Sequence, residues 1–170
     1  MKQILYLAFG LIVLLSVSSC KKGDSSNPSL ILNTWKIDVD NTSEKSSFTF
    51  SQVSGTLSTQ GYQLLDMHGD DVVNPAINHC RLQIFFNTIG PPPSGTYTVT
   101  SYENLANMQN GAAIIVTRND YVVHKADENQ SINVIFANGT LEVKFNNINI
   151  TREGQGWTNK YAKLSASLRK

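Results

Sequence analysis

One short segment of the chain holds its densest group of potential metal ligands. Asp66, His68, Asp70 and Asp71 fall within six residues, and carboxylate oxygens and imidazole nitrogens commonly bind divalent cations. Their spacing matches neither the twelve-residue calcium loop nor the His-x-x-x-His pattern of a zinc-binding helix. The segment is therefore predicted to be either a metal site of another kind or a solvated acidic turn.

A reactive thiol is a second possibility. His79 precedes Cys80 and His124 lies further along the chain, and a histidine base can activate a thiol nucleophile. Adjacent residues on a strand point to opposite faces, however, so His79 would not readily reach the Cys80 sulfur. Because Cys80 alternates with apolar residues, we expect a buried structural thiol.

A loop near the end of the chain offers a different kind of binding surface. Trp157 lies between Gly156 and Thr158, shortly before Asn159. An exposed tryptophan can stack on a sugar ring or on a partner protein, and a nearby amide can add hydrogen bonds. Trp157 and Asn159 are therefore candidate ligand-binding residues. The alternative is that Trp157 folds back and covers an open end of the domain.

The sequence contains no recognised catalytic motif. It has no Gly-x-Ser-x-Gly, no phosphate-cradling glycine loop and no nucleotide fingerprint. The paired carboxylates of a glycoside hydrolase depend on a geometry that sequence alone does not provide. We predict no catalytic residue and no cofactor, and an envelope hydrolase is the least favoured alternative.

The first twenty residues predict where the protein resides. Lys2 precedes an apolar run over residues 4–17, which is shorter than the roughly 20 apolar residues of a membrane-spanning helix. The run ends in Val-Ser-Ser-Cys at residues 17–20. This ending resembles the lipobox of bacterial lipoproteins, in which the cysteine is acylated and becomes the first residue of the mature chain.

The lipobox resemblance implies a signal peptide over residues 1–19 and attachment to the membrane through acylated Cys20. The polar stretch that follows is typical of a flexible tether, so residues 20–30 are predicted as lipidated cysteine and tether. Lys21, in place of an aspartate, implies the outer membrane. Surface-exposed lipoproteins of Bacteroidota-type bacteria tend to carry acidic residues here, whereas this chain has only Asp24 behind two lysines. Periplasmic and surface exposure both remain open.

Composition limits the mature chain to one electrically neutral domain. About 150 residues follow the signal peptide, which is enough for a single domain over residues 31–170. Without Lys2, thirteen basic residues balance thirteen acidic ones, so there is no nucleic-acid footprint. With Cys20 acylated, Cys80 has no partner in the chain, which excludes a disulfide framework and a cysteine-based zinc site.

Alternation of apolar and polar residues dominates this domain and predicts strands. Asn138-Gly139 separates two alternating runs and favours a two-residue type I′ hairpin. A change of parity further along predicts a bulge at Asn146-Asn147. Residues 102–110 could hold one helical turn. The expected strands are 33–39, 47–53, 55–59, 62–67, 79–87, 95–101, 112–118, 121–125, 131–137, 140–150 and 161–169.

These strands predict an all-β fold, and we favour an antiparallel β-sandwich of about ten strands over a closed barrel. The connections at 69–78, 88–94 and 102–111 are long enough to cross between two sheets. The chain resembles small β-sandwich lipoproteins of unknown function from Bacteroidota-type bacteria. The likeness rests on the lipobox, the strands at 34–40 and 95–99, the hairpin at 138–145 and the terminal strand at 163–166.

A weaker likeness is to bacterial lipocalin-like lipoproteins, whose first strand carries a Gly-x-Trp element, whereas Asn33 takes the place of the glycine before Trp35. Neither resemblance supplies a catalytic residue. The expected function is that of a non-enzymatic, lipid-anchored module that binds a glycan or a partner protein at the cell envelope. The alternative is a lipocalin-like carrier of a small apolar ligand, which would require an internal apolar cavity.

Overall fold

The computed structural model describes residues 30–40, 45–59, 61–154 and 161–170, and it is all-β. The predicted signal peptide, Cys20, Trp157 and Asn159 lie outside these residues. The strands are β1 (Thr34–Asp40), β2 (Lys45–Thr59), β3 (Gln63–Asp71), β4 (His79–Phe86), β5 (Gly95–Val99), β6 (Gly111–Arg118), β7 (Val122–Ala126), β8 (Ser131–Ala137), β9 (Thr140–Arg152) and β10 (Tyr161–Arg169). A 3₁₀ turn, η1 (Leu105–Asn107), falls where one helical turn is predicted.

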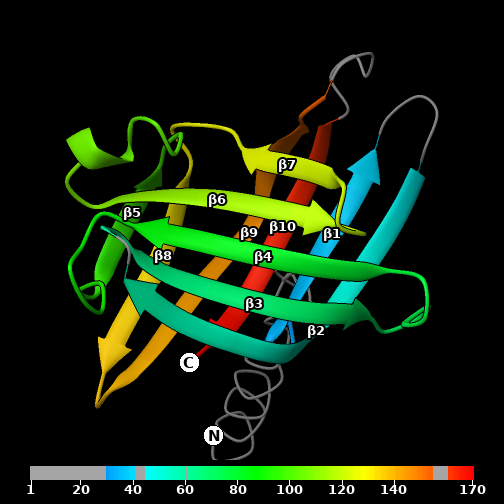
Figure 1. Cartoon of the computed structure of the whole chain (residues 1–170), viewed down its shortest axis with the longest axis horizontal. Coiled ribbons are helices and arrows are strands. Elements are labelled where there is room, and N and C mark those ends of the chain that lie inside the picture. Colours follow the sequence, from blue (N-terminus) through cyan, green and yellow to red (C-terminus); the bar gives the residue numbers. More distant parts are fainter. Residues whose placement is uncertain (1–29, 41–44, 60, 155–160) are drawn as a thin grey trace, which may run out of the picture.

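The ten strands form one continuous hydrogen-bonded sheet. Strands β1 to β4 pair antiparallel in sequence order, followed by β4 with β6, β6 with β7, β8 with β9 and β9 with β10. Strand β10 also pairs with β1, so the sheet closes on itself. Figure 1 shows β3, β4, β6 and β7 as one layer running across β1, β9 and β10 behind it.

The predicted division into two separate sheets is not confirmed, because the pairing is continuous around the closed sheet. The connections expected to cross between sheets have other roles. Residues 69–71 belong to β3, and 72–78 form a hairpin connection to β4. The other two connections flank β5, which lies parallel to β6 and antiparallel to β8. The arrangement is therefore closer to a flattened barrel.

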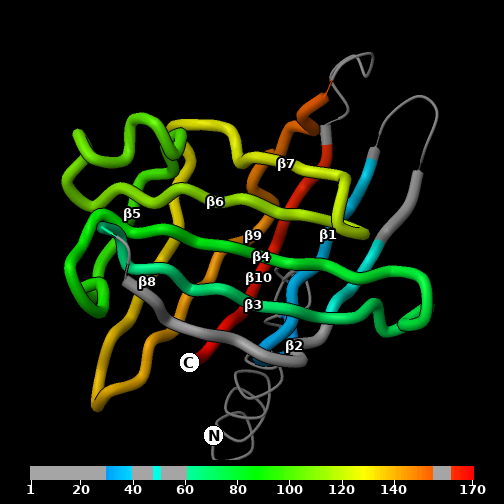
Figure 2. The backbone as a smooth tube through the Cα atoms, in the orientation of Figure 1, coloured from blue at the N-terminus to red at the C-terminus, as the bar shows by residue number. Residues whose placement is uncertain are grey.

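Strands β7 and β8 follow one another along β9, as the yellow trace in Figure 2 shows. Residues 127–130 connect them, and within the described chain β9 has no strand partner on this edge between β7 and β8. Here the Gln130 side chain makes backbone hydrogen bonds that a neighbouring strand would otherwise make. Its Nε2 donates to the Asn149 carbonyl at 3.0 Å, and its Oε1 accepts from the Asn149 N–H at 2.6 Å. The N–H and C=O of Asn149 thus remain paired on the edge of β9 that lies between β7 and β8.

The inward faces of the strands form one hydrophobic core. Trp35 stacks on Phe50 with ring centroids 5.9 Å apart, and Phe86 meets Tyr97 edge to face at 5.4 Å. The alternation that predicts strands such as β4 and β7 therefore corresponds to burial on one side. The largest fully buried side chains are Trp35, Tyr97, Phe50, Phe86, Ile37, Leu65, Met67, Leu82, Ile84, Leu105, Ile132 and Leu141.

Two local predictions about β9 are confirmed. Asn138 and Gly139 have φ angles of 51° and 76°, as a type I′ turn requires. Further along, Asn146 and Asn147 together lie opposite Ser165, so the strand carries a bulge. The Ser165 hydroxyl accepts from the Asn147 N–H at 2.9 Å and donates to Asn146 Oδ1 at 2.8 Å. This one side chain therefore satisfies the polar groups that the bulge displaces.

Two strand boundaries differ from the prediction. Strand β2 is one strand of 15 residues with a register shift between Gln52 and Ser54, where two strands were expected. Strand β3 continues to Asp71 instead of ending at residue 67. In both places polar residues continue a hydrogen-bonded ladder, although such a polar composition is depleted in strands and indicates a turn.

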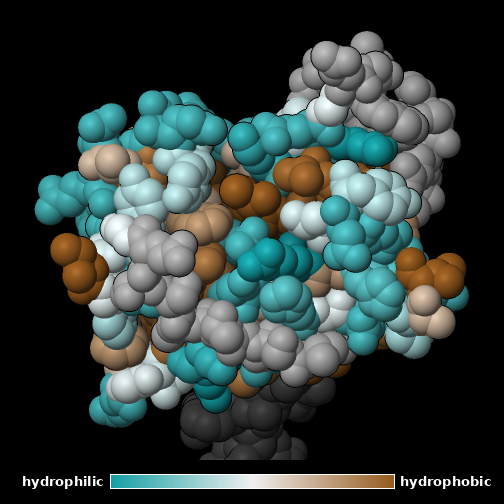
Figure 3. Space-filling model, viewed as in Figure 1, coloured by the Kyte–Doolittle hydropathy of each residue, from teal (hydrophilic) through white to brown (hydrophobic). Residues whose placement is uncertain are grey.

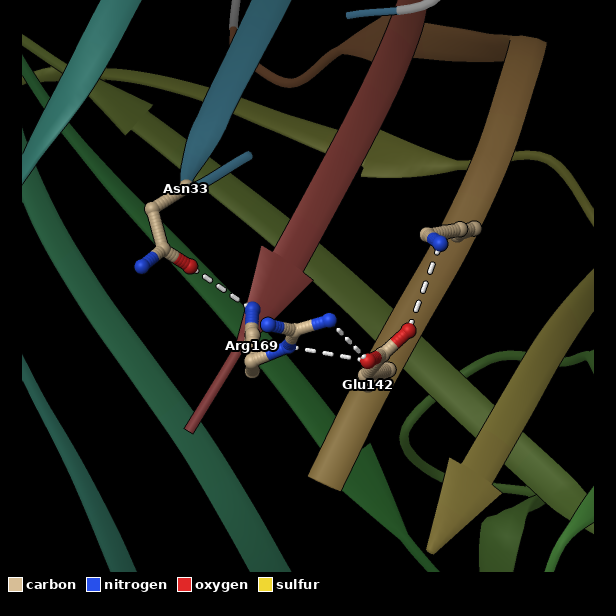
Figure 4. A network of polar contacts seen from close by, with 4 residues as sticks. Asn33, Glu142 and Arg169 are labelled. Carbon is tan, nitrogen blue, oxygen red and sulfur yellow. Dashed lines mark hydrogen bonds and ion pairs between the residues drawn. The ribbon is translucent and has the colours of Figure 1, made fainter. Parts of the chain in front are cut away.

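Polar contacts reinforce the closed sheet at the start of β1 and the end of β10, as Figure 4 shows. The Arg169 backbone N–H donates to Asn33 Oδ1 at 2.7 Å, and Arg169 Nε donates to Glu142 Oε1 at 2.8 Å. Lys144 Nζ lies 3.2 Å from the second oxygen of Glu142. Hydrogen bonds from Arg169 and then Lys144 lower the pKa of Glu142. The network links β1, β9 and β10.

Candidate functional site

The predicted metal ligands lie on strand β3 and face both sides of it. Asp66, His68 and Asp70 are on the outer face, whereas Asp71 is turned inward and only 3% exposed. The Asp71 carboxylate accepts from Asn78 Nδ2 at 3.2 Å. Within the described residues, no three His, Cys, Asp or Glu side chains come close enough together to hold a metal ion. The four predicted ligands are therefore not brought to one point.

The outer face of β3 instead forms pairs with the outer face of β4. In the antiparallel register His68 lies opposite Arg81, and Asp70 lies opposite His79. Arg81 binds Asp66 with two hydrogen bonds, one of them from Nε to Oδ1 at 2.8 Å. His68 Nε2 is 3.4 Å from the same carboxylate, and His79 Nδ1 is 2.8 Å from Asp70 Oδ1.

The electrostatics of these pairs hold the side chains in place. A hydrogen bond from the guanidinium to Asp66 raises the pKa of Arg81 above its ordinary value. A two-point contact between guanidinium and carboxylate also fixes the orientation of both groups. Arg81 covers Asp66, whose side chain is only 9% exposed although it lies on the outer face. The paired side chains of Arg81 and Asp66 thus form a polar centre of this surface and are held in fixed orientations.

Residues of β3 and β4, Arg81 included but not Asp66, border a hollow of about 400 Å³. That volume lies within the range of sites for small molecules. Figure 3 shows hydrophilic side chains gathered over β3 and β4 on this face of the molecule. The hollow therefore offers a concave surface whose lining is rich in hydrogen-bonding groups. The lining residues are His68, Gly69, Asp70, His79, Cys80, Arg81, Thr117 and Asp120.

The connection between β6 and β7 places the last of these residues at the hollow. Asn119 and Asp120 have φ angles of 52° and 63°, a left-handed conformation that Asn and Asp tolerate better than most residues. The Asn119 N–H donates to the His79 carbonyl at 2.9 Å, and its Oδ1 accepts from the His79 N–H at 2.9 Å. These two bonds hold the connection against the start of β4.

Exposed apolar side chains lie in the two connections next to the hollow. Val72, Val73 and Ile77, in the connection from β3 to β4, are 58%, 74% and 67% exposed. Tyr121, directly after Asp120, is 76% exposed. A hydrophobic group at the right edge of Figure 3 lies over the β3–β4 connection. Apolar surface therefore adjoins the polar lining and could contact the apolar face of a ligand.

Cys80 has the structural role that alternation predicts. Its side chain is 4% exposed and belongs to the core, and the indole N–H of Trp35 donates to Sγ at 3.2 Å. Burial raises the pKa of Cys80 to about 12. The His79 side chain points to the outer face, where it contacts Asp70. His124 is 4% exposed on the inner face of β7. The geometry gives a thiol nucleophile no support.

The interior also gives no support to the carrier alternative. A carrier would need an apolar cavity, but the described inward side chains pack into one cluster in which most are less than 5% exposed. The hollow is bordered by charged outer-face residues such as Arg81 and Asp70 instead. If the protein binds a small molecule in this part of the chain, the outer hollow is the better candidate.

The sequence identified His68 and Asp70 as candidate site residues. It did not predict that they share one site with His79, Arg81, Thr117 and Asp120. The alternation that places His79 and Arg81 on the outer face was a usable signal. Thr117 and Asp120 lie at the hollow because β4 pairs with β6. This long-range pairing is not visible in the sequence.

Comparison with known proteins gives no match to a family model, a curated protein or a solved structure. Among the described residues, no helix is long and apolar enough to cross a membrane.

Proposed function

We propose that the protein is a lipid-anchored, non-enzymatic binding module of the bacterial cell envelope, and that its outer hollow binds a sugar of a glycan. The observation that carries this proposal is the hollow itself, bordered by fixed polar side chains from β3, β4 and β6. Recognition at such a place needs donors and acceptors that a rigid scaffold holds in position.

The chemistry of the lining favours an uncharged, hydroxyl-rich ligand. Arg81 is paired with Asp66, and the His79 ring is hydrogen-bonded to Asp70, so these polar groups are held in place within the protein. Carboxylates accept hydrogen bonds from hydroxyls, and imidazole or guanidinium groups donate to them. Tyr121, the residue that follows Asp120, carries an exposed aromatic ring, which suits the apolar face of a sugar.

The anchor rests on the lipobox that ends at Cys20. Stable attachment takes about two acyl chains, which the acylated cysteine of a lipoprotein supplies. Replacing Cys20 by Ala should abolish labelling with a fatty-acid probe and move the protein out of the outer-membrane fraction. Undiminished label in the Cys20→Ala protein would refute the anchor.

Binding can be tested with a glycan array and a pair of matched variants. Thr117→Trp places a large side chain in the hollow at a strand position, where aromatic residues are well tolerated. Ser131→Trp makes the same change at an exposed position at the start of β8. We expect the Thr117→Trp protein to lose the glycan that the wild-type protein binds, and the Ser131→Trp protein to keep it. Equal binding by both variants would place the site elsewhere, and an array without hits would refute glycan binding.

A further inference from the structure

Two aliphatic side chains are held outward where the described chain enters the sheet. Ile31 is 79% exposed and Leu32 is 40% exposed. Their backbone is fixed, because the Thr34 hydroxyl donates to the Ile31 carbonyl at 2.5 Å and the Asn33 N–H donates to the Ser167 carbonyl at 2.6 Å. The turn therefore presents these side chains in a defined direction.

The position of this turn along the chain brings it close to the proposed anchor. Leu30 is only the tenth residue after Cys20, and ten residues span at most about 36 Å even when fully extended. An acylated Cys20 would thus keep the turn within that distance of the lipid surface. A short link gives the second contact a high effective concentration, so a weak contact can be occupied.

The charges beside the turn complement an anionic lipid surface. Arg169 is fixed next to Asn33, and Lys170 is paired through its backbone to Leu141. Together with Lys144 they contribute three positive side chains against the one negative side chain of Glu142. Lys21 and Lys22 follow Cys20 in the sequence. Basic groups near a membrane are attracted to anionic headgroups.

We propose that Ile31, Leu32 and Lys170 form a basal edge that rests on the membrane, with the two aliphatic side chains in the headgroup region. This inference depends on the proposed anchor at Cys20. In Figure 1 the start of β1 and the end of β10 lie at the lower side, whereas the β3–β4 connection beside the hollow lies at the right edge. Contact through the basal edge would therefore leave the hollow accessible to a glycan.

The test compares two positions of similar exposure in the full lipidated protein. Ile31→Cys and Val73→Cys, at positions 79% and 74% exposed, are each labelled with a bimane fluorophore. Cys80 is buried and should not take the label. Each protein is reconstituted into vesicles of anionic and zwitterionic phospholipids with brominated acyl chains. We expect bimane at residue 31 to be quenched at least twofold more than bimane at residue 73.

Vesicle flotation separates the two possible failures. If both proteins float and are quenched equally, the anchor is intact and the basal edge is refuted. If neither protein floats, the anchor at Cys20 fails and the basal edge fails with it. A further variant, Leu32→Ser in the Ile31→Cys background, should reduce the quenching at residue 31 without affecting flotation. Unchanged quenching in that variant would also contradict the proposed contact.

Discussion

Replacing Gly139 by Val tests the hairpin between β8 and β9 with little interference from packing. Gly139 has a φ of +76°, and a Cβ atom at this position would meet nothing within 4 Å. The substitution therefore causes no clash, and its effect comes from the backbone. A β-branched residue in the left-handed region costs about 1–3 kcal/mol. Loss of glycine's freedom in the unfolded chain offsets about 0.4–1 kcal/mol of that.

The expected net loss is therefore about 0–2.6 kcal/mol with a midpoint of about 1.3 kcal/mol, and that midpoint lowers the melting temperature of a domain of this size by about 3–5 °C. The matched control is Gly95→Val at the first residue of β5. A Cβ atom there also meets nothing within 4 Å, but Gly95 is not among the residues with positive φ. Because valine favours strands, the control should stay within about 0.5 kcal/mol of wild type.

Thermal unfolding followed by circular dichroism distinguishes the two variants. The reasoning predicts that Gly139→Val melts several degrees below both the wild-type protein and Gly95→Val. If the two valine variants melt together, the positive φ at Gly139 does not determine the turn and its type I′ assignment is wrong.

Three further predictions concern Cys80, Ser165 and Glu142. Because Cys80 is buried and its pKa is raised to about 12, a thiol reagent at pH 8 should label it only after denaturant is added, and rapid labelling of the native protein would contradict its packing. Ser165→Ala leaves the Asn147 N–H without its acceptor and should lower the free energy of unfolding, measured by chemical denaturation, by about 1–3 kcal/mol. An unchanged free energy of unfolding would show that the Ser165 hydroxyl does not stabilise the bulge. Hydrogen bonds from Arg169 lower the pKa of Glu142 in the folded protein below its ordinary 4.5. Ionised Glu142 therefore stabilises the folded protein above pH 4.5, and this contribution is lost as the pH falls through the folded-state pKa. The stability difference between wild type and Glu142→Gln should therefore close in acid, and a difference independent of pH would refute this.

Local features of the fold were predictable because their causes are local. Alternation located most strands, and Asn138-Gly139 specified its own turn through residues that tolerate positive φ. The bulge at Asn146-Asn147 followed from a change of parity within one strand. Each of these inferences needed only residues that are close together in the sequence.

The closure of the sheet depends on distant pairings that the sequence does not specify locally. Strand β10 pairs with β1 across more than a hundred residues, and β5 inserts between β6 and β8. Long connections were compatible with a sandwich and with the closed sheet alike. The expected strand ended at residue 67, and the acidic segment was predicted to be a metal site or a solvated turn because Asp is rare in strands, although Asp66, His68 and Asp70 alternate as strand residues do.

The candidate site was partly predictable for the same reason. His68 and Asp70 stood out through their chemistry, and the outward parity of His79 and Arg81 could be read along β4. The register of β4 against β6 then decides that Thr117 lies opposite Arg81. That register is fixed by the burial of a whole sheet face and not by any short motif.

The most direct test of glycan binding at the hollow is an amide chemical-shift titration with the oligosaccharide that the wild-type protein selects on the array. The proposal predicts that the largest shifts fall on His68–Asp70, His79–Arg81 and the segment from Thr117 to Asp120. Shifts confined to residues 154–159 would contradict it and move the binding site to the segment that contains Trp157.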